Sequence, residues 1–267
     1  MSLRERLERG DFVITLEISP PGDSAMDEFI RIARENKVDA INVPDNQRGI
    51  PRLSSLAASK ILLDNKIEPI MHLSCANRNR TEMESLILGA EALKIPNLLI
   101  MTGDHPLVAK NREAKPVFDI DSVDALRLAK EKSKLHLGAV ANQMSNIELQ
   151  AELVNRKVDA GAEFIQTQPV FDISRLEELI DAASVKTKWI AGVMSIRSTK
   201  SAEFVSRKIP GIEVSGEITE RLRNSKDPDK EGIQIMRDIL DEFKEFGRIS
   251  GVSLMSLSGI DIGEFLG

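Results

Sequence analysis

Eight short apolar segments alternate with amphipathic segments along almost the whole chain. The apolar segments have the length of buried strands, and the segments between them carry apolar residues at helical spacing. We expect strands over Phe12–Ile18, Val38–Val43, Ile67–Leu73, Asn97–Met101, Leu135–Ala141, Ala162–Gln166, Lys188–Met194 and Gly251–Leu257. Continuous apolar strands that alternate with helices are typical of a parallel sheet with a covered outer face. Eight such units in 267 residues predict an α/β fold, a (β/α)₈ TIM barrel.

The predicted helices fill the intervals between these strands. They are Ser24–Asn36, Leu53–Leu63, Thr81–Leu93, Ser122–Lys132, Asn146–Ala160, Ser174–Ala183, Ser201–Lys208 and Glu217–Phe246. Ser122 and Ser174 are expected to cap their helices, and Gly161 and Gly247 stand where glycine ends helices. The last segment is one helix or a helix pair broken near Pro228. A doubly wound sheet is the alternative, but Ser-Pro-Pro-Gly-Asp replaces the glycine-rich fingerprint expected after its first strand.

The composition restricts the partners and the kinds of site. The 42 acidic and 36 basic residues are spread along the chain, which argues against a nucleic-acid or membrane footprint. No apolar run has spanning length, and the first residues read as a charged helix, so we expect a soluble, cytoplasmic protein with one domain over residues 1–267. A single cysteine, Cys75, excludes an internal disulfide, and three scattered histidines argue against a metal site.

Polar residues stand where nearly every predicted strand ends. The strands lead to Glu17, to Pro44-Asp45-Asn46-Gln47, to His72, to Thr102-Gly103-Asp104, to Asn142-Gln143 and to Gln168. Barrels of this class place their chemistry at the carboxyl ends of the strands. We therefore expect these side chains to share one rim.

Two rim residues have properties that suit ligand chemistry. Glu17 lies within the apolar segment TLEIS, where burial raises the pKa of a carboxyl group and suits it to donate a proton. The alternative is a salt bridge to Arg48 or Arg197. Gln168 carries a donor and an acceptor, so it can bind a heterocycle that presents both. The alternative is that it satisfies a loop carbonyl.

Four further residues have a structural and a functional interpretation. Asp104 follows Gly103, whose missing side chain lets a flat ligand approach the backbone, although aspartate also forms turns. His72 is a satisfied core histidine, and a metal role is less favoured because no carboxylate or second histidine stands at ligand spacing. Lys157 is a helix-terminal cation, or it reaches a phosphate across the barrel mouth. Cys75 is expected to be a small packing residue.

With these residues assembled, the chain resembles the methylenetetrahydrofolate reductase family, flavoprotein barrels that reduce methylenetetrahydrofolate to methyltetrahydrofolate. The resemblance covers essentially the full length. It rests on five motifs in order at the strand ends: TLEISPPGD, INVPDNQRGIPRLSSLAAS, PIMHLSCANRNR, LLIMTGDHP and KVDAGAEFIQTQPVFD. Pro44 departs from the family, which often has threonine there.

The resemblance implies a role for each matching residue. Glu17 matches the acid that assists opening of the five-membered ring to an iminium. Asp104 matches the aspartate near the flavin and the pterin, and Gln168 matches a glutamine that contacts the substrate. The positions that match the flavin lining are His72, Thr102, Gly103, Asp104, Asp121, Ser122, Ala139 and Lys157. The implied reaction is a ping-pong hydride transfer from reduced flavin to methylenetetrahydrofolate.

The cofactor and the electron donor implied by the resemblance have alternatives. The flavin is FAD or FMN, because Gln150 and Leu153 stand where longer relatives support the adenylate half of FAD. The donor is NAD(P)H or a partner protein, because no aromatic residue for stacking a nicotinamide stands near Arg197. Compact relatives work with an electron-donating subunit, so we expect an oligomer, including the option of a hetero-oligomer. The segment 217–246 is one candidate contact.

Two other functions are consistent with these residues. One is a pterin-binding barrel of the methyltransferase type, which moves a methyl group to a cobamide or a thiol and predicts no flavin. The other is a flavin subunit that relays electrons within a larger reductase complex.

Overall fold

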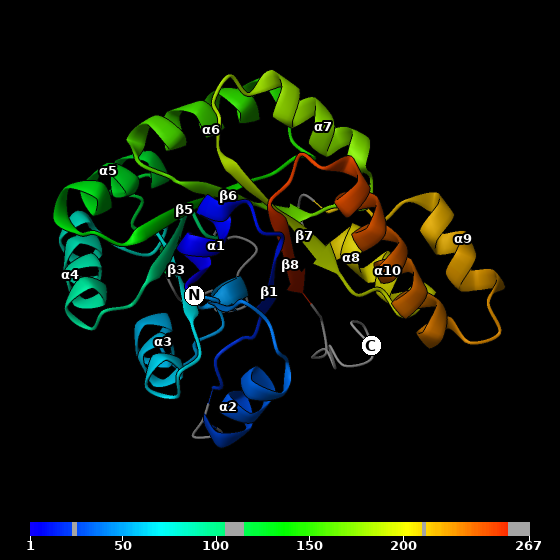
Figure 1. Cartoon of the computed structure of the whole chain (residues 1–267), viewed down its shortest axis with the longest axis horizontal. Coiled ribbons are helices and arrows are strands. Elements are labelled where there is room, and N and C mark those ends of the chain that lie inside the picture. Colours follow the sequence, from blue (N-terminus) through cyan, green and yellow to red (C-terminus); the bar gives the residue numbers. More distant parts are fainter. Residues whose placement is uncertain (23–25, 105–114, 210–211, 256–267) are drawn as a thin grey trace.

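The structure is a computed structural model that describes residues 1–22, 26–104, 115–209 and 212–255. Eight parallel strands pair in chain order and close when β8 pairs with β1 (Figure 1). They are β1 Val13–Glu17, β2 Ala40–Val43, β3 Pro69–Ser74, β4 Asn97–Met101, β5 His136–Ala141, β6 Phe164–Pro169, β7 Lys188–Met194 and β8 Gly251–Met255. The predicted (β/α)₈ barrel is confirmed. That residues 1–267 form one domain stays a prediction.

Helices surround the barrel on its outer side, except α1 (Leu3–Arg9), which lies over one end (Figure 1). They are α1 Leu3–Arg9, α2 Met26–Glu35, α3 Ser55–Asp64, α4 Arg80–Ala92, α5 Ser122–Lys132, α6 Ile147–Ala160, α7 Ile173–Ala182, α8 Thr199–Lys208, α9 Gly216–Asn224 and α10 Pro228–Phe246, with a 3₁₀ turn η1 at Gln47–Gly49. The last predicted helix is therefore a pair, because proline has no N–H to donate and begins α10. No helix among the described residues is long and apolar enough to cross a membrane.

The helix ends differ in part from the prediction. Gly161 and Gly247 follow α6 and α10 with positive φ, as expected. Asp121, however, caps α5 in place of Ser122, and Asp172 caps α7 in place of Ser174. Each aspartate accepts hydrogen bonds from backbone N–H groups of the first turn, so the preceding carboxylate displaces the serine from the capping position.

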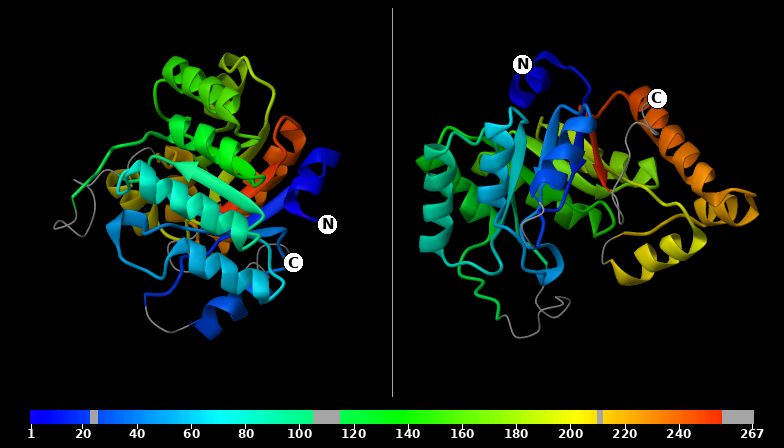
Figure 2. Two further views of the ribbon diagram at one scale, coloured as in Figure 1. Left: turned by 90° about the vertical axis from the view of Figure 1, so that its left-hand side faces the viewer. Right: turned by 90° about the horizontal axis from the view of Figure 1, so that it is seen from below.

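The amino-terminal end of the barrel is closed by α1. Leu3 and Leu7 are at most 1% exposed and pack on one layer of interior side chains. This layer consists of Val13, Ala40, Ile70, Leu99, Phe164 and Ile190. Figure 2 shows α1 at one end of the barrel, away from the loops that follow the strands. Together, α1 and this layer form an apolar plug at the amino-terminal end. Polar chemistry is therefore expected at the carboxyl end of the strands.

A β-bulge interrupts the pairing of β6 with β7. Gln166 pairs with Ile190, but Pro169 pairs with Gly192, so three steps on β6 oppose two on β7. The predicted strand ended at Gln166, whereas β6 continues to Pro169. A Cβ on Gly192 would lie 2.8 Å from the backbone of Gln168, so only glycine allows this approach. The bulge re-aims the side chains at the end of β6.

Candidate active site

Two carboxylates at the carboxyl end of the barrel are held by neighbouring residues of one turn. Glu17, the last residue of β1, accepts a hydrogen bond at 3.2 Å from Nε2 of Gln47. Asp104, which follows β4, accepts one at 2.5 Å from the backbone N–H of Arg48. The turn η1 therefore brings together two residues that are 87 positions apart in the sequence (17 and 104). Among the described residues Glu17 forms no ion pair, so its contact with Gln47 is neutral and the alternative of a salt bridge is not observed.

The environment of Glu17 raises the pKa of its carboxyl group into the neutral range, so that a substantial fraction stays protonated there. Burial raises the pKa of Glu17 to about 7, and the negative charge of Asp104 raises it further. The hydrogen bond from Gln47 acts in the opposite direction, because it stabilises the carboxylate. Glu17 is thus suited to donate a proton, as the sequence predicted.

The turn η1 is anchored by a buried ion pair that sequence reasoning did not single out. The Asp45 side chain is 1% exposed and pairs with Arg78, whose two terminal nitrogens lie 2.5 and 3.0 Å from its oxygens. Asp45 also accepts hydrogen bonds from the backbone N–H and the hydroxyl of Ser74, both at 2.9 Å. Because Ser74 ends β3, this cluster ties the loop after β2 to the neighbouring strand. Asp45 and Arg78 are far apart in the sequence, and no local sequence pattern indicates which of the 42 acidic residues pairs with this arginine.

The end of β6 presents amide groups toward the interior. The Gln168 side chain is half-buried and has no hydrogen-bond partner in the described part of the chain. The loop carbonyls are satisfied by Gln143, whose Nε2 donates to Pro169 O at 2.8 Å. Gln166 is 3% exposed, and its Oε1 is buried without a partner. A buried acceptor without a partner favours a ligand that donates a hydrogen bond.

His72 belongs to a buried polar layer between the apolar plug and the rim. Its Nε2 lies 2.9 Å from Oδ1 of Asn42, and Asn42 in turn donates to Thr15 and Ser253. Burial lowers the pKa of His72 to about 4, so the ring is neutral at physiological pH. The interpretation of His72 as a satisfied core histidine accounts for one of its two ring nitrogens.

Two predicted flavin-lining residues, Asp121 and Lys157, lie close to Cys75 behind the rim. The negative charge of Asp121 acts on the pKa of both Cys75 and Lys157, which places the three groups in one neighbourhood. Lys157 is 3% exposed, and its Nζ donates to Val140 O at 2.6 Å. Burial lowers the pKa of Lys157 to about 8. Lys157 therefore contacts β5 in this structure, and its predicted contact with a phosphate across the barrel mouth stays a prediction.

The remaining predicted positions differ in their access to the barrel mouth. Thr102 is exposed, and Gly103 has φ of +89° directly before Asp104. Ser122 is buried at the first turn of α5. Ala139 is fully buried in the layer between strands and helices, so its side chain faces away from the interior. The flavin-lining roles of these residues stay predictions.

Cys75 is 1% exposed, and burial raises the pKa of its thiol to about 12, which is consistent with a packing residue.

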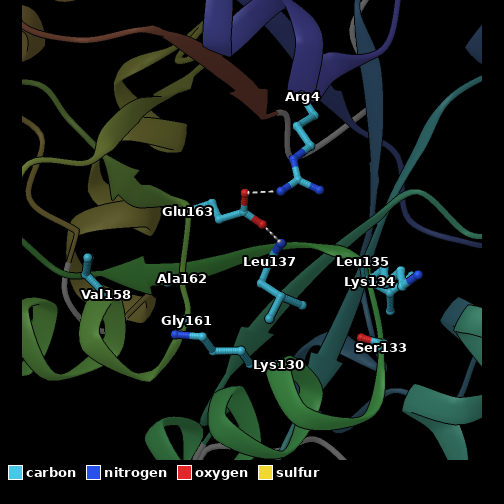
Figure 3. A pocket seen from close by; sticks show the side chains of 10 residues that line it. All are labelled: Arg4, Lys130, Ser133, Lys134, Leu135, Leu137, Val158, Gly161, Ala162 and Glu163. Carbon is cyan, nitrogen blue, oxygen red and sulfur yellow. Dashed lines mark hydrogen bonds and ion pairs between the residues drawn. The ribbon is translucent and has the colours of Figure 1, made fainter.

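A cavity of about 560 Å³ lies at the opposite, amino-terminal end of the strands (Figure 3). It is lined by Arg4, Lys130, Ser133, Lys134, Leu135, Leu137, Val158, Gly161, Ala162 and Glu163. Arg4 and Glu163 form an ion pair at 2.6 Å, so their charges offset each other (Figure 3). None of the predicted site residues lines this cavity. Among the described residues no group of three or more His, Cys, Asp or Glu is arranged to hold a metal ion.

Comparison with known proteins identifies relatives of the whole chain. The family model for methylenetetrahydrofolate reductase matches residues 2–259. "Methylenetetrahydrofolate reductase 2" of Schizosaccharomyces pombe is 23% identical over 97% of this chain and 45% of its own length. The Saccharomyces cerevisiae protein of the same name is 28% identical over 70% of this chain and 33% of its own length. The chain thus spans less than half the length of these curated relatives.

Solved structures show the same fold at low sequence identity. An uncharacterized protein from Clostridium thermocellum, described as binding two copies of 5-methyl-5,6,7,8-tetrahydrofolic acid, superposes with a TM-score of 0.73 and 19% identity, covering 97% of this chain and 94% of that one. Phosphonopyruvate hydrolase superposes with a TM-score of 0.59 and 11% identity over 95% and 80% of the two chains. Because the family model matches nearly the full length, the chain belongs to the methylenetetrahydrofolate reductase family.

Proposed function

We propose that this protein reduces 5,10-methylenetetrahydrofolate to 5-methyltetrahydrofolate with the help of a bound flavin. The observation that carries the proposal is the pair of carboxylates, Glu17 and Asp104, that accept hydrogen bonds from η1, with the pKa of Glu17 raised to about 7. Such a group is a proton donor at neutral pH, and ring opening of the substrate requires one. The folate ligand described for the Clostridium thermocellum protein supports the same substrate class.

The interior near the rim suits a flat, polar heterocycle such as a flavin. Met101 and Val140 are half-buried apolar side chains that pack on the interior cluster and offer a surface for a ring. Gln166 Oε1 supplies a buried acceptor for a ring N–H. These residues, with His72 beside them, would hold the cofactor. When bound, it would supply the hydride that reduces the methylene carbon.

The rim residues would then orient and activate the folate. Glu17 holds a proton and releases it to a ring nitrogen as the carbon–nitrogen bond of the five-membered ring breaks, which leaves the electrophilic iminium carbon. Asp104 accepts hydrogen bonds from donors on the pterin. Its negative charge would favour the oxidised form of a flavin bound beside it. The amide of Gln168 binds a donor and an acceptor of the same ring. Positioning of this kind supplies much of the rate enhancement.

An absorption spectrum of the purified protein tests the flavin, and mass identification of the molecule released on denaturation separates FAD from FMN. Dye-linked oxidation of methyltetrahydrofolate by the flavin-loaded chain then tests the reaction. We expect a yellow protein with dye-linked activity. A colourless protein that does not take up added flavin would support the methyltransferase-type barrel instead. A flavin-loaded protein without dye-linked activity would support an electron-relay subunit.

The electron donor is proposed to be NAD(P)H or a partner protein. Anaerobic addition of NADH or NADPH distinguishes the two, because a direct donor bleaches the bound flavin. If neither bleaches it while dye-linked activity is present, a partner subunit donates the electrons.

A further inference from the structure

In the polar layer of the barrel interior, hydrogen bonds link Thr15, Asn42 and His72 in series. Which atom donates in each bond is set at the Thr15 end. The hydroxyl of Thr15 donates to the backbone carbonyl of Val252 at 3.3 Å, and a carbonyl oxygen only accepts. With its proton committed, Thr15 Oγ1 accepts from Nδ2 of Asn42 at 2.9 Å. The amide of Asn42 therefore presents Oδ1, which only accepts, to Nε2 of His72 at 2.9 Å. This arrangement assigns the proton of His72 to Nε2.

The surroundings of Asn42 enforce this orientation of its amide. Thr15, Asn42 and Ser253 are each 0% exposed, so bulk water does not compete for their hydrogen bonds. A reversed amide would place Asn42 Oδ1 against Thr15 Oγ1, and the threonine hydroxyl would have to give up its contact with the Val252 carbonyl to donate to it. An unmade buried hydrogen bond costs about 1–3 kcal/mol. Ser253, 3.1 Å from Asn42 Nδ2, does not set the direction, because a serine hydroxyl both donates and accepts.

We propose that Thr15 and Asn42 act as positioning residues that fix His72 as its neutral Nε2–H tautomer, and so make Nδ1 an acceptor for the ligand. Nδ1 has no hydrogen-bond partner among the described residues. A fixed acceptor selects a ligand N–H or O–H at this place and disfavours a ligand carbonyl. The lowered pKa of His72, caused mainly by burial, keeps the ring from gaining a second proton at neutral pH. Only the identity of the ligand, a flavin or a folate, rests on the proposed function.

A second interior histidine has the opposite assignment and provides an internal reference. Asn97 Nδ2 donates to the carbonyl of Pro69 at 3.0 Å and to Glu68 Oε1 at 2.8 Å. Its Oδ1 therefore accepts, and the atom 2.8 Å away is Nδ1 of His136. His136 is thus fixed as the Nδ1–H tautomer. The two histidines share a barrel interior and carry their protons on different nitrogens.

Long-range ¹H–¹⁵N correlation spectra of the full chain, labelled at histidine, test the assignment directly. The chain has three histidines, and His105→Gln and His136→Gln variants assign their signals. At neutral pH, with and without bound flavin, we expect a protonated Nε2 and a bare Nδ1 for His72, and the reverse for His136. A protonated Nδ1 on His72 would overturn the proposal. This result does not depend on any catalytic activity.

A matched pair of variants tests the cause. Thr15→Val keeps the shape but removes the group that sets the direction, so part or all of the His72 population should move its proton to Nδ1. Ser253→Ala removes the other contact of Asn42 and should leave the tautomer unchanged. An unchanged His136 spectrum serves as the check of folding. If Thr15→Val does not fold, the wild-type spectrum alone decides the assignment. A folded Thr15→Val protein whose His72 keeps only the Nε2–H form would overturn the role of Thr15.

Flavin titration of the same variants tests the ligand. We expect binding about tenfold weaker for Thr15→Val, the effect of losing about one hydrogen bond, and unchanged binding for Ser253→Ala. A switched tautomer with unchanged affinities for flavin and folate would overturn the role of Nδ1. A wild-type protein that binds neither would refute the proposed function, whereas the spectra would still decide the tautomer.

Discussion

The carboxylate of Asp104 accepts a hydrogen bond from the backbone N–H of Arg48 at 2.5 Å. Because the donor is a backbone group, this contact depends on the conformation of η1 rather than on the arginine side chain. Asn46 and Arg48 both have positive φ, 49° and 59°, a conformation that non-glycine residues adopt only where their surroundings enforce it. The same turn donates to Glu17 through Gln47. The conformation of one turn thus controls both carboxylates.

Replacement of Glu17 by glutamine tests the proton donor. Glu17→Gln keeps the shape and removes the ionisable proton, so we expect near-normal flavin content and flavin reduction. Folate reduction should fall at least about 100-fold, the lower bound for loss of a general acid. The two half-reactions are measured separately by stopped-flow absorbance. Glu8→Gln, an exposed change on α1 at the opposite end, serves as the control. Unchanged folate turnover in Glu17→Gln would contradict the proposed role.

The raised pKa of Glu17 also predicts how stability depends on pH. In the folded protein the pKa is about 7, against an ordinary value of 4.5 that applies to the unfolded chain. The folded state therefore binds the proton more tightly, so the contribution of Glu17 is fully present below about pH 4.5 and is lost as the pH rises to about 7. Other groups titrate in the same range, but they cancel in a comparison with Glu17→Gln. We expect the variant to gain stability relative to wild type across this window in urea titrations, and a constant difference would exclude the shift.

Asp104→Asn removes a charge and keeps a hydrogen-bond acceptor. The charge of Asp104 is one cause of the raised pKa of Glu17, so we expect the basic limb of the folate pH–rate profile to move to lower pH. We also expect an altered flavin potential and weaker folate binding. Potentiometry and folate titration measure these quantities. An unchanged pH limb together with a normal potential and normal affinity would show that Asp104 does not act on the site electrostatically.

Sequence patterns predicted the parts of this fold that depend on local periodicity. Each strand, such as Asn97–Met101, is a short apolar run with definite ends, and the carboxyl ends of parallel strands necessarily meet at one rim. Contacts between distant residues left no such pattern. The ion pair of Asp45 with Arg78 and the contact of Arg48 with Asp104 depend on loop conformations that no propensity encodes. The bulge at Gln168 had one signal in the sequence, the glycine at position 192 inside a strand.

Asp45→Asn tests the anchor of η1. The variant leaves the Arg78 guanidinium, with a side chain 15% exposed, without its countercharge. Loss of one partner of a buried ion pair costs about 3–5 kcal/mol, so we expect a decrease of this size in the free energy of unfolding. Asp241→Asn, which breaks an exposed pair with Lys244, should cost less than about 1 kcal/mol. Urea denaturation compares the two. If Asp45→Asn lowered the free energy of unfolding no more than Asp241→Asn does, the Asp45 cluster would not hold the loop.

Gly192→Ala tests whether the bulge positions Gln168. An added Cβ would lie 2.8 Å from the carbonyl carbon and oxygen of Gln168 and 2.9 Å from Pro169 N, and these backbone atoms must move to admit it. We expect a loss of about 1–3 kcal/mol of stability, as for other overpacked sites, and weaker folate binding by isothermal titration. Gly216→Ala meets nothing within 4 Å and should be neutral or stabilising, with normal binding. In Gly138→Ala the three atoms nearest to the added Cβ belong to the Phe164 ring, in the layer next to α1, so this variant provides a destabilised control. Folate affinity that falls equally in Gly138→Ala and Gly192→Ala would attribute the loss to stability, whereas a loss confined to Gly192→Ala assigns it to the aim of the Gln168 amide.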